Sequence, residues 1–394
     1  MQFVVVIVVI AVFVVFGTMF GLFLLRSRGM HRCFVSYLKQ SSRRRIPSSD
    51  EPVHVLICFA DHYEPKYRNP LPEIALQRVR TWVDRYPKQF REFRDSDDKP
   101  PRYTFFYPSE EYDPEYLDLL RGLCQEGFGE VEIHLHHDQD TPDSFRTNLL
   151  RFKAALVERH GLLSHDRVTG EVMYGFIHGN WVLCNWHKNG LNCGVNEEIT
   201  ILRETGCYAD LTMPTAPGIP QGPIINSIYY ARDIPGQARS HEKGVLANGH
   251  APEDGLLMIQ GPLVLDWKTR KFGVLPKLEN GCVQTSQVAD VSRLPSWLKA
   301  GVQVPTRPDW FFVKLHMHGA PEDSHEALLG EPMVRFHQDL AALAKANSNF
   351  HFHYVTAREM YNLVKAAEAG WTGSVEDARD YQLVWNGGLP RVES

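Results

Sequence analysis

The chain begins with one long apolar run. Residues 3–25 carry no charged side chain, and only Gly17, Thr18 and Gly21 interrupt the aliphatic and aromatic positions. An α-helix rises about 1.5 Å per residue, so a helix of this length crosses a hydrocarbon core about 30 Å thick. A cleaved signal peptide would have a basic start and a cleavage site after small residues, and neither is evident. Residues 1–25 are therefore predicted to be a transmembrane anchor.

Basic residues follow the apolar run, and none precedes it. They are Arg26, Arg28, Arg32, Lys39, Arg43, Arg44 and Arg45. The positive-inside rule places such a flank in the cytoplasm. Residues 26–50 are therefore expected to be a basic linker. The chain is expected to be a single-pass membrane protein whose soluble part is cytoplasmic.

From residue 51 the pattern changes to alternating strand and helix signals. The nearly continuous apolar run at 53–59 is typical of a buried parallel strand, and helical periodicity follows at 72–93. Further strands are expected at 103–107, 130–137, 173–177, 208–213, 310–316 and 351–355, with helices at 114–126, 144–160, 200–205, 332–346 and 357–369. Strands that alternate with helices indicate an α/β fold with a largely parallel sheet, open or closed into a barrel.

One stretch of the soluble part lacks this regularity. Residues from about 214 to 305 are rich in proline and glycine and give only short strand signals. We interpret them as a long insertion. Residues 51–394 are then one domain that carries this elaboration.

Composition excludes two classes of protein. The net charge is −5, and the basic excess is confined to the linker, so a nucleic-acid surface is not expected. The seven cysteines are odd in number and form no C-x-x-C pair, which does not fit a disulfide framework. Reduced thiols agree with a cytoplasmic location.

Side chains that can bind a metal follow the ends of three predicted strands. They are Asp61, His62, Glu64, His134, His136, Asp138, Asp140, His316 and His318. Histidine nitrogens and carboxylate oxygens bind divalent ions such as zinc, and a catalytic site keeps one position open for water. Such an ion makes its water nucleophilic near neutral pH and polarises a carbonyl. For any single histidine the alternative is an ordinary hydrogen-bonded ring.

The order of these segments resembles that of the NodB-homology polysaccharide deacetylases, carbohydrate esterase family four. The resemblance covers about residues 53–213 and 310–364. It implies a distorted seven-stranded (β/α) barrel that removes N- or O-acetyl groups from sugars with a divalent metal. The family motif Thr-Phe-Asp-Asp-Gly corresponds to residues 58–62. Asp61 thereby matches the family's metal-binding aspartate.

The second family motif, Glu-Ile with two later histidines, matches the strand at 130–137. Glu132, Ile133 and His136 fall in register, and Asp140 takes the place of the second histidine. In another register His134 is the first ligand. The resemblance therefore implies a metal site, with zinc as the expected ion, among Asp61, His134, His136 and Asp140.

The last family motif places a general acid at the end of an apolar strand. Leu315-His316 matches it, which gives that role to His316 and makes His318 the reserve. Ala60 stands where the family has its catalytic base. That task would pass to His62, Glu64 or Asp138, or to Asp61 itself if His62 helps to hold the metal.

These features predict a membrane-anchored, metal-dependent deacetylase that acts on an acetylated sugar or a lipid-linked glycan precursor in polysaccharide biosynthesis. Tyr63, Trp181, Trp186 and Tyr230 are candidates for stacking on sugar rings or for ordinary packing. One alternative is a glycoside hydrolase on a related barrel, which needs two carboxylates about 5–9.5 Å apart. The other is a catalytically silent protein that binds glycan or scaffolds an assembly, as Ala60 suggests.

Overall fold

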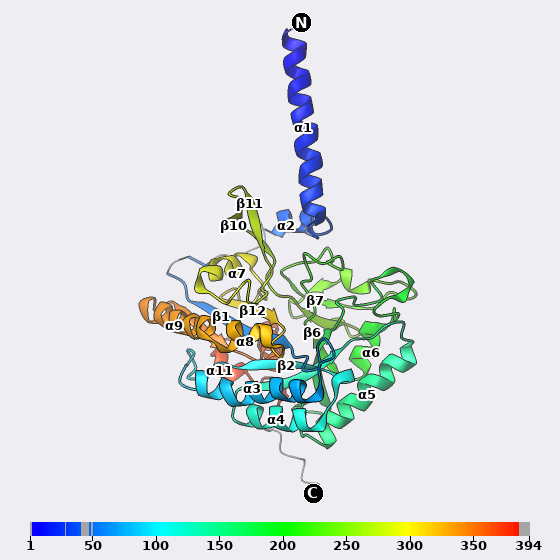
Figure 1. Cartoon of the computed structure of the whole chain (residues 1–394), viewed down its shortest axis with the longest axis vertical. Coiled ribbons are helices and arrows are strands. Elements are labelled where there is room, and N and C mark those ends of the chain that lie inside the picture. The colour runs from blue at the N-terminus through cyan, green and yellow to red at the C-terminus, as the bar shows by residue number, and fades with distance from the viewer. Residues whose placement is uncertain (1, 28, 41–46, 49, 386–394) are drawn as a thin grey trace.

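The structure, a computed structural model, describes residues 2–27, 29–40, 47–48 and 50–385. The apolar run forms helix α1 (Gln2–Ser27), which leaves the rest of the molecule as an isolated helix (Figure 1). The most apolar window of its stretch Val5–Ser27 is 0% buried. By length and composition this helix can cross a membrane, and a signal sequence would meet the same criterion.

The chain that follows α1 is attached to the domain. Met30 and Cys33 are fully buried in a small apolar cluster with Ala216. Arg32 forms an ion pair with Glu242. A short helix, α2 (Phe34–Gln40), comes next. The segment after α1, which was expected to be a linker, is therefore packed against the domain through buried contacts.

A largely parallel sheet forms the centre of the domain, as the alternating pattern predicts. Its path of paired strands is β12 (Trp310–Met317), β1 (Val53–His62), β2 (Tyr103–Pro108), β3 (Gly129–Leu135), β5 (Val172–His178), β6 (Cys207–Asp210), β9 (Leu256–Ile259), β7 (Ile228–Ala231) and β8 (Val245–Leu246). β13 (Phe350–Tyr354) pairs with the first half of β1 on the edge that β2 uses further along. Among the described strands no pairing joins β12 to the other end of this path. Of the two arrangements left open by the sequence, the pairing of these strands gives the open sheet, and the distorted barrel that the resemblance implies is not closed by it.

Helices cover the sheet, and the residues from 214 to 305 add short elements. The main helices are α3 (Pro72–Phe90), α4 (Pro114–Gln125), α5 (Pro142–Glu158), α6 (Glu198–Glu204), α7 (Leu294–Ala300), α8 (Glu322–Leu329), α9 (Glu331–Ala346), α10 (Ala357–Glu368) and α11 (Val375–Ala378). Two short strands, β4 (Ser164–Asp166) and β14 (Leu383–Val384), pair beside β5, and a hairpin is formed by β10 (Val264–Lys271) and β11 (Leu275–Glu279). Thr141 caps α5 through a capping box with Ser144, because its side chain accepts an N–H that the first helical turn cannot satisfy.

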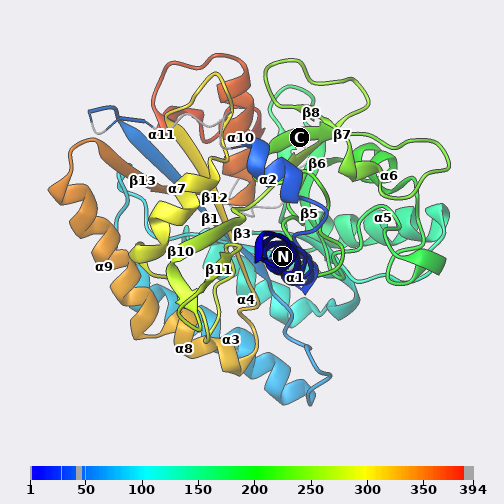
Figure 2. The same ribbon diagram turned by 90° about the horizontal axis from the view of Figure 1, so that it is seen from above.

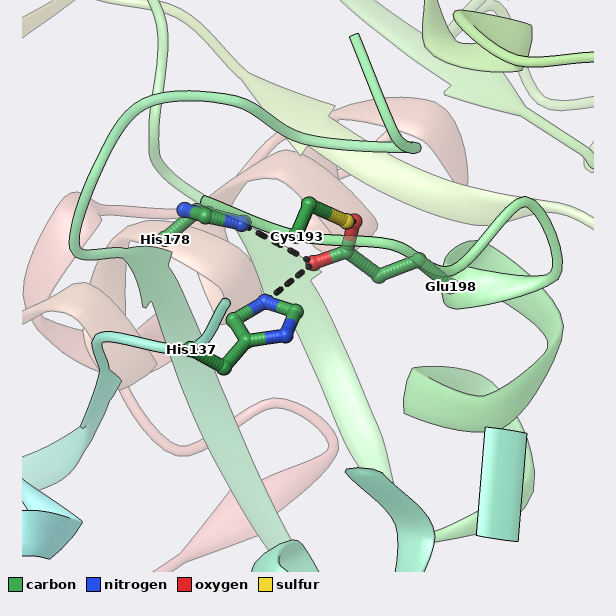
Figure 3. A group of neighbouring side chains, drawn as sticks. All are labelled: His137, His178, Cys193 and Glu198. Carbon is green, nitrogen blue, oxygen red and sulfur yellow. Dashed lines mark hydrogen bonds and ion pairs between the residues drawn. The ribbon is translucent and has the colours of Figure 1, made fainter. Parts of the chain in front are cut away.

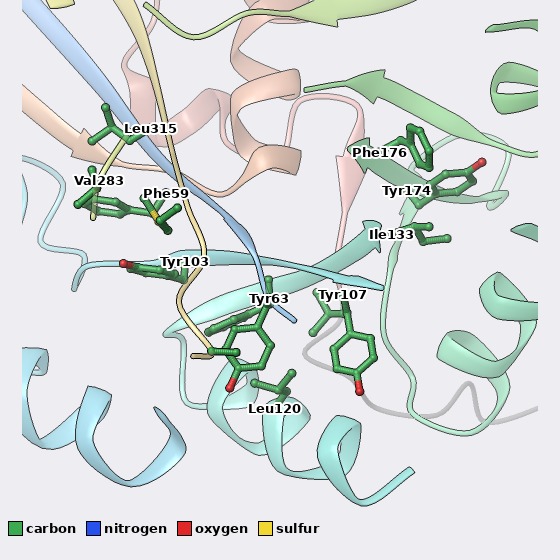
Figure 4. Packing of buried hydrophobic residues seen from close by; sticks show 14 of the residues in the cluster. Phe59, Tyr63, Tyr103, Tyr107, Leu120, Ile133, Tyr174, Phe176, Val283 and Leu315 are labelled. Atoms are coloured by element: carbon green, nitrogen blue, oxygen red, sulfur yellow. The ribbon is translucent and has the colours of Figure 1, made fainter. Parts of the chain in front are cut away.

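The two faces of β1 belong to different apolar clusters. Phe59 and Tyr63 pack with Tyr103 in the larger cluster (Figure 4), whereas Cys58 and Ala60 face the other one. Successive side chains of a strand point to opposite faces of the sheet. The side chains of Asp61 and His62, at the end of β1, therefore point to opposite faces of the sheet.

Helix α10 is held to β3 by a buried ion pair. The guanidinium of Arg358 donates from Nε and Nη2 to the carboxylate of Glu130 at 2.8–3.1 Å, and from Nη1 to Asp380. Arg358 and Glu130 are both buried. A buried carboxylate that loses its partner is costly, because neither water nor another cation replaces it.

Replacing Arg358 by methionine is therefore expected to lower the free energy of unfolding by about 3–5 kcal/mol. Denaturant titration of the detergent-solubilised chain measures this loss. The double variant Arg358→Met/Glu130→Gln should recover part of it, because Glu130 no longer leaves a buried charge without its partner. Equal stability of the single variant and the wild type would contradict the role given to this pair.

A buried neutral histidine makes stability depend on pH. His337 is fully buried between α9 and β13, with Nδ1 2.6 Å from the hydroxyl of Tyr354. Burial lowers the pKa of His337 from 6.5 to about 3. Between these values only the unfolded chain binds the proton. The contribution of His337 is therefore complete above pH 6.5 and is lost as the pH falls toward 3.

For this reason, His337→Asn should weaken the pH dependence of unfolding. Between pH 7 and pH 5 the wild type is expected to lose about 2 kcal/mol more than the variant. Chemical denaturation at the two pH values provides the comparison. The same loss in both proteins would mean that His337 takes up a proton in the folded state.

Candidate metal centre

Histidines and one carboxylate gather where parallel strands end. His62 is the last residue of β1, His134 lies near the end of β3, and His318 follows β12. Glu64 comes two residues after β1 and is almost fully buried. The carboxyl ends of parallel strands lie at one edge of a sheet, which is where ligand sites of open α/β sheets occur.

Two histidine rings converge on one oxygen of Glu64. His134 Nε2 lies 3.2 Å and His136 Nε2 lies 3.6 Å from Glu64 Oε1. Ligand atoms of these three residues are all within 4.8 Å of one another. His318 Nε2 approaches the same oxygen at 4.0 Å, and His62, His318 and Glu64 form a second group within 4.8 Å. Glu64 is the residue that the two groups share.

In both converging rings the other nitrogen, Nδ1, already donates a hydrogen bond. His134 Nδ1 donates to the carbonyl of Ile177 at 2.9 Å, and His136 Nδ1 donates to Glu110 Oε1 at 2.5 Å. A carbonyl can only accept, so Nδ1 of His134 carries a proton, and Nε2, which lies within hydrogen-bond distance of Glu64 Oε1, is the atom that can bind a metal ion in place of a proton. Metal-binding histidines have this arrangement, with a backbone carbonyl or a carboxylate behind the ring.

The charges of the group favour a cation at its centre. Burial raises the pKa of Glu64, but the hydrogen bond with His134 and the positive charge of the surrounding rings when they are protonated outweigh burial, so the pKa lies below its usual value and the carboxylate is ionised. Burial lowers the pKa of His62 and of His318, so both rings are neutral at neutral pH. His62 Nδ1 is buried and makes no hydrogen bond to any described residue. These residues can hold a metal ion.

A second group lies nearby and is drawn in Figure 3. It consists of His137, His178, Cys193 and Glu198, all buried, with ligand atoms within 4.8 Å of one another. Glu198 is central: its Oε1 lies 3.4 Å from His137 Nε2 and 3.7 Å from His178 Nε2 (Figure 3). By distance alone, this group can also hold a metal ion.

Protonation competes with a metal ion in both groups, and more strongly in the second. In the first group, burial opposes a charge on His136, but Glu110 and Glu64 outweigh it and raise its pKa above the usual value. His178 Nδ1 accepts the N–H of Asn180 at 3.1 Å, so the proton of the neutral ring is on Nε2, where a metal would have to bind. Burial opposes a charge on His137, but Asp140 and Glu198 outweigh it and raise its pKa to about 9. His137 is then an imidazolium between two carboxylates. The second group is stable as an ion cluster, and the group around Glu64 fits a metal better.

A third group, on the other side of the domain, is neutralised by arginine. Asp97 Oδ2 lies 2.8 Å from His353 Nδ1 and 2.7 Å from the guanidinium of Arg379, which also contacts Asp95. These ion pairs account for the cluster as part of the core.

The structure brings together only part of the ligand set expected from the sequence. His134 and His136 converge, so the choice between the two registers disappears. Asp61 lies outside both groups around Glu64, and its Oδ1 accepts the N–H of Gly319 at 2.7 Å. Burial raises the pKa of Asp61 to about 8. Asp140 is beside His137, 3.2 Å from its Nδ1, and belongs to the surroundings of the second group.

The residues expected to act as general acid or base do not all lie at one site. His316 lines a cavity together with His318, and its Nδ1 has no partner among the described residues. Burial holds the pKa of His316 well below its usual value. Asp138 is exposed, and its Oδ1 accepts the N–H of Asn192. Glu64 is engaged with the histidines.

One of the four candidate stacking aromatics lies at the site. The Trp181 ring is 6.1 Å from His62 and 6.4 Å from His318, centroid to centroid. Tyr63 packs edge-on against Trp82 inside the core. Tyr230 donates its hydroxyl to Glu368. Trp186 is also buried.

The sequence pattern did not single out Glu110, whose carboxylate accepts the hydrogen bond from Nδ1 of His136. It lies directly after β2, at a fourth polar strand end, and the rule that found the other three would have found it as well. The carbonyl of Ile177 leaves no signal in the sequence, because any residue supplies one.

Comparison of the sequence with models of protein families and with curated proteins finds no match. Arguments about function therefore depend on the geometry of the site.

Metal content provides a test of the two groups. His136→Ala should remove the ion bound by the full chain, and Glu110→Gln should weaken its binding about 10–100-fold, because the ring loses the acceptor that orients it. Mass spectrometry of metals in the purified protein measures this, with the exposed His250→Ala as the control. If His136→Ala kept its metal and Cys193→Ala lost it, the second group would be the metal centre.

Proposed function

We propose that the protein is a membrane-anchored, metal-dependent hydrolase that removes an acetyl group from a sugar, most simply as a deacetylase of a lipid-linked glycan precursor. The observation that carries this proposal is the convergence of His134 and His136 on Glu64. Nδ1 of each ring already donates a hydrogen bond to another group, so Nε2 is the nitrogen that faces Glu64. The resemblance to the polysaccharide deacetylases supports the choice of reaction.

The proposed division of labour follows from burial and exposure. A divalent metal, with zinc preferred, would lower the pKa of a bound water and polarise the acetyl carbonyl. Glu64, His134 and His136 would hold it, with His62 and His318 beside them. Trp181 stands near His62 and His318, where it can pack against a sugar ring.

His316 is our candidate for proton transfer. The ring is neutral and partly exposed, it lines the cavity, and its buried Nδ1 has no hydrogen-bond partner among the described residues. A neutral imidazole can accept the proton of the attacking water and return it to the nitrogen or oxygen that leaves the acetyl group. The products are then acetate and the free amine or hydroxyl. On this route the His316 ring acts as general acid and also as general base, the role that Ala60 at the family's base position does not supply.

The substrate proposal depends on the anchor. If α1 spans the membrane with its basic flank in the cytoplasm, the site works close to the inner leaflet, where sugars are carried on lipids. A secreted mature polymer would not reach it.

Acetate release tests this function. The full chain in detergent, incubated with an N-acetylated lipid-linked sugar, should release acetate only with a divalent metal present. His316→Asn should lower the rate about 10²–10⁴-fold while the metal content stays at the wild-type level. His136→Ala should lose both metal and activity. Release of reducing sugar in place of acetate would favour the glycoside hydrolase, and binding of the sugar without any product would favour the silent scaffold.

A further inference from the structure

The cavity that contains His316 and His318 reaches the end of the anchor. Its volume is about 830 Å³, and it is lined by Ser27, the last residue of α1, as well as by these two histidines. The loop 214–218 forms another part of its wall. If Val5–Ser27 crosses the membrane, then Ser27 lies at the level of the lipid headgroups, and the cavity connects that level to the candidate site.

The wall of the cavity has a positive character. Arg270 on β10 and Lys277 on β11 line it, together with neutral polar residues such as Asn280 and Gln284. The residues that the structure describes around the cavity include no acidic side chain. Guanidinium and ammonium groups bind phosphate oxygens through charge-assisted hydrogen bonds.

The hairpin that carries these two cations exposes apolar side chains. In its turn, Phe272 is 82% exposed and Val274 is 67% exposed, and Trp267, within β10, is 53% exposed. The hairpin projects from the domain on the side where α1 leaves it, and β10 and β11 lie beside α1 in both views (Figures 1 and 2). Exposed apolar side chains next to a membrane anchor fit the interfacial layer of a bilayer, where tryptophan in particular is favoured.

Contacts within the protein fix the anchor relative to the cavity. Met30 and Cys33 pack against Ala216 of the loop that lines it. The hydroxyl of Tyr37 on α2 accepts the N–H of Leu265 on β10 at 3.1 Å. The start of the hairpin, the loop and the chain after α1 are thus one packed unit, so the orientation of α1 also orients the mouth of the cavity.

We propose that this cavity binds the phosphate-bearing headgroup of a membrane lipid, while the tip of the β10–β11 hairpin lies in the same bilayer leaflet. The acyl chains of the lipid then stay in the membrane beside α1, and the part of the headgroup beyond the phosphate points toward His316 and His318. This inference deepens the proposed function, on which it rests only for the statement that the headgroup is a substrate. Binding itself requires neither metal nor turnover.

Cys282 provides a direct probe of the cavity. It lines the cavity and is partly exposed, whereas the other six cysteines are buried. Burial raises the pKa of its thiol to about 11, so alkylation by a maleimide is followed at alkaline pH. Loss of labelling in Cys282→Ser confirms the labelled site.

A short-chain phosphatidic acid added to the full chain in detergent micelles should slow the alkylation of Cys282. The double variant Arg270→Gln/Lys277→Gln should need at least about tenfold more lipid for the same protection, because it removes two charged donors to the phosphate. Lys268→Gln, a change on the same hairpin but outside the cavity lining, is the matched control. Equal protection by a diacylglycerol, which has no phosphate, or by inorganic phosphate alone, or no protection at all, would overturn the proposal.

Bilayer contact of the hairpin has its own readout. In vesicles of lipids brominated on their acyl chains, tryptophan fluorescence of the reconstituted chain should be quenched more in the wild type than in Trp267→Phe. Equal quenching of the two proteins would show that the hairpin stays in water at Trp267. Both experiments are independent of acetate release, so failure of the deacetylase proposal and failure of lipid binding can be told apart.

Discussion

The ionised carboxylate of Glu64, buried among four histidines, is the constraint around which the candidate site is built. A buried charge is tolerated only when opposite charge and hydrogen bonds compensate for the lost water. Here the nearest rings are held with their proton-bearing nitrogens turned away, toward Ile177 and Glu110. The ring nitrogens of His134 and His136 that face Glu64 are therefore the ones that can bind a cation in place of a proton. A divalent cation resolves this arrangement, because it binds the carboxylate and the ring nitrogens together.

Parts of this site were readable from the sequence, for reasons that lie in strand geometry. The alternation that placed His134 and His136 on one side of their strand, and the position of polar residues at strand ends, depend on local chemistry. These two residues do meet. The largely parallel sheet followed from the spacing of strands and helices, which is also a local signal.

Other parts depend on contacts that no local pattern encodes. Asp61 was assigned to the metal by its position in a family motif. Strand β1 continues to His62, however, so the side chains of Asp61 and His62 point to opposite faces of the sheet, and Asp61 accepts the N–H of Gly319 instead. The sheet curves without closing by strand pairing, and pairing between distant strands has no sequence signature. The second group combines His137, which follows β3, with His178 at the end of β5 and with Cys193 and Glu198 from the chain after it, so its ion cluster became visible only with the fold.

The claim that decides the rest is that a metal ion binds at Glu64. Anomalous diffraction from crystals of the full chain grown with zinc, measured on both sides of the zinc absorption edge, locates the ion without reference to activity. A peak about 2.0–2.2 Å from His134 Nε2, His136 Nε2 and a Glu64 oxygen is the predicted result. A peak between His137, Cys193 and Glu198 with none at Glu64, or no peak at all, would contradict it.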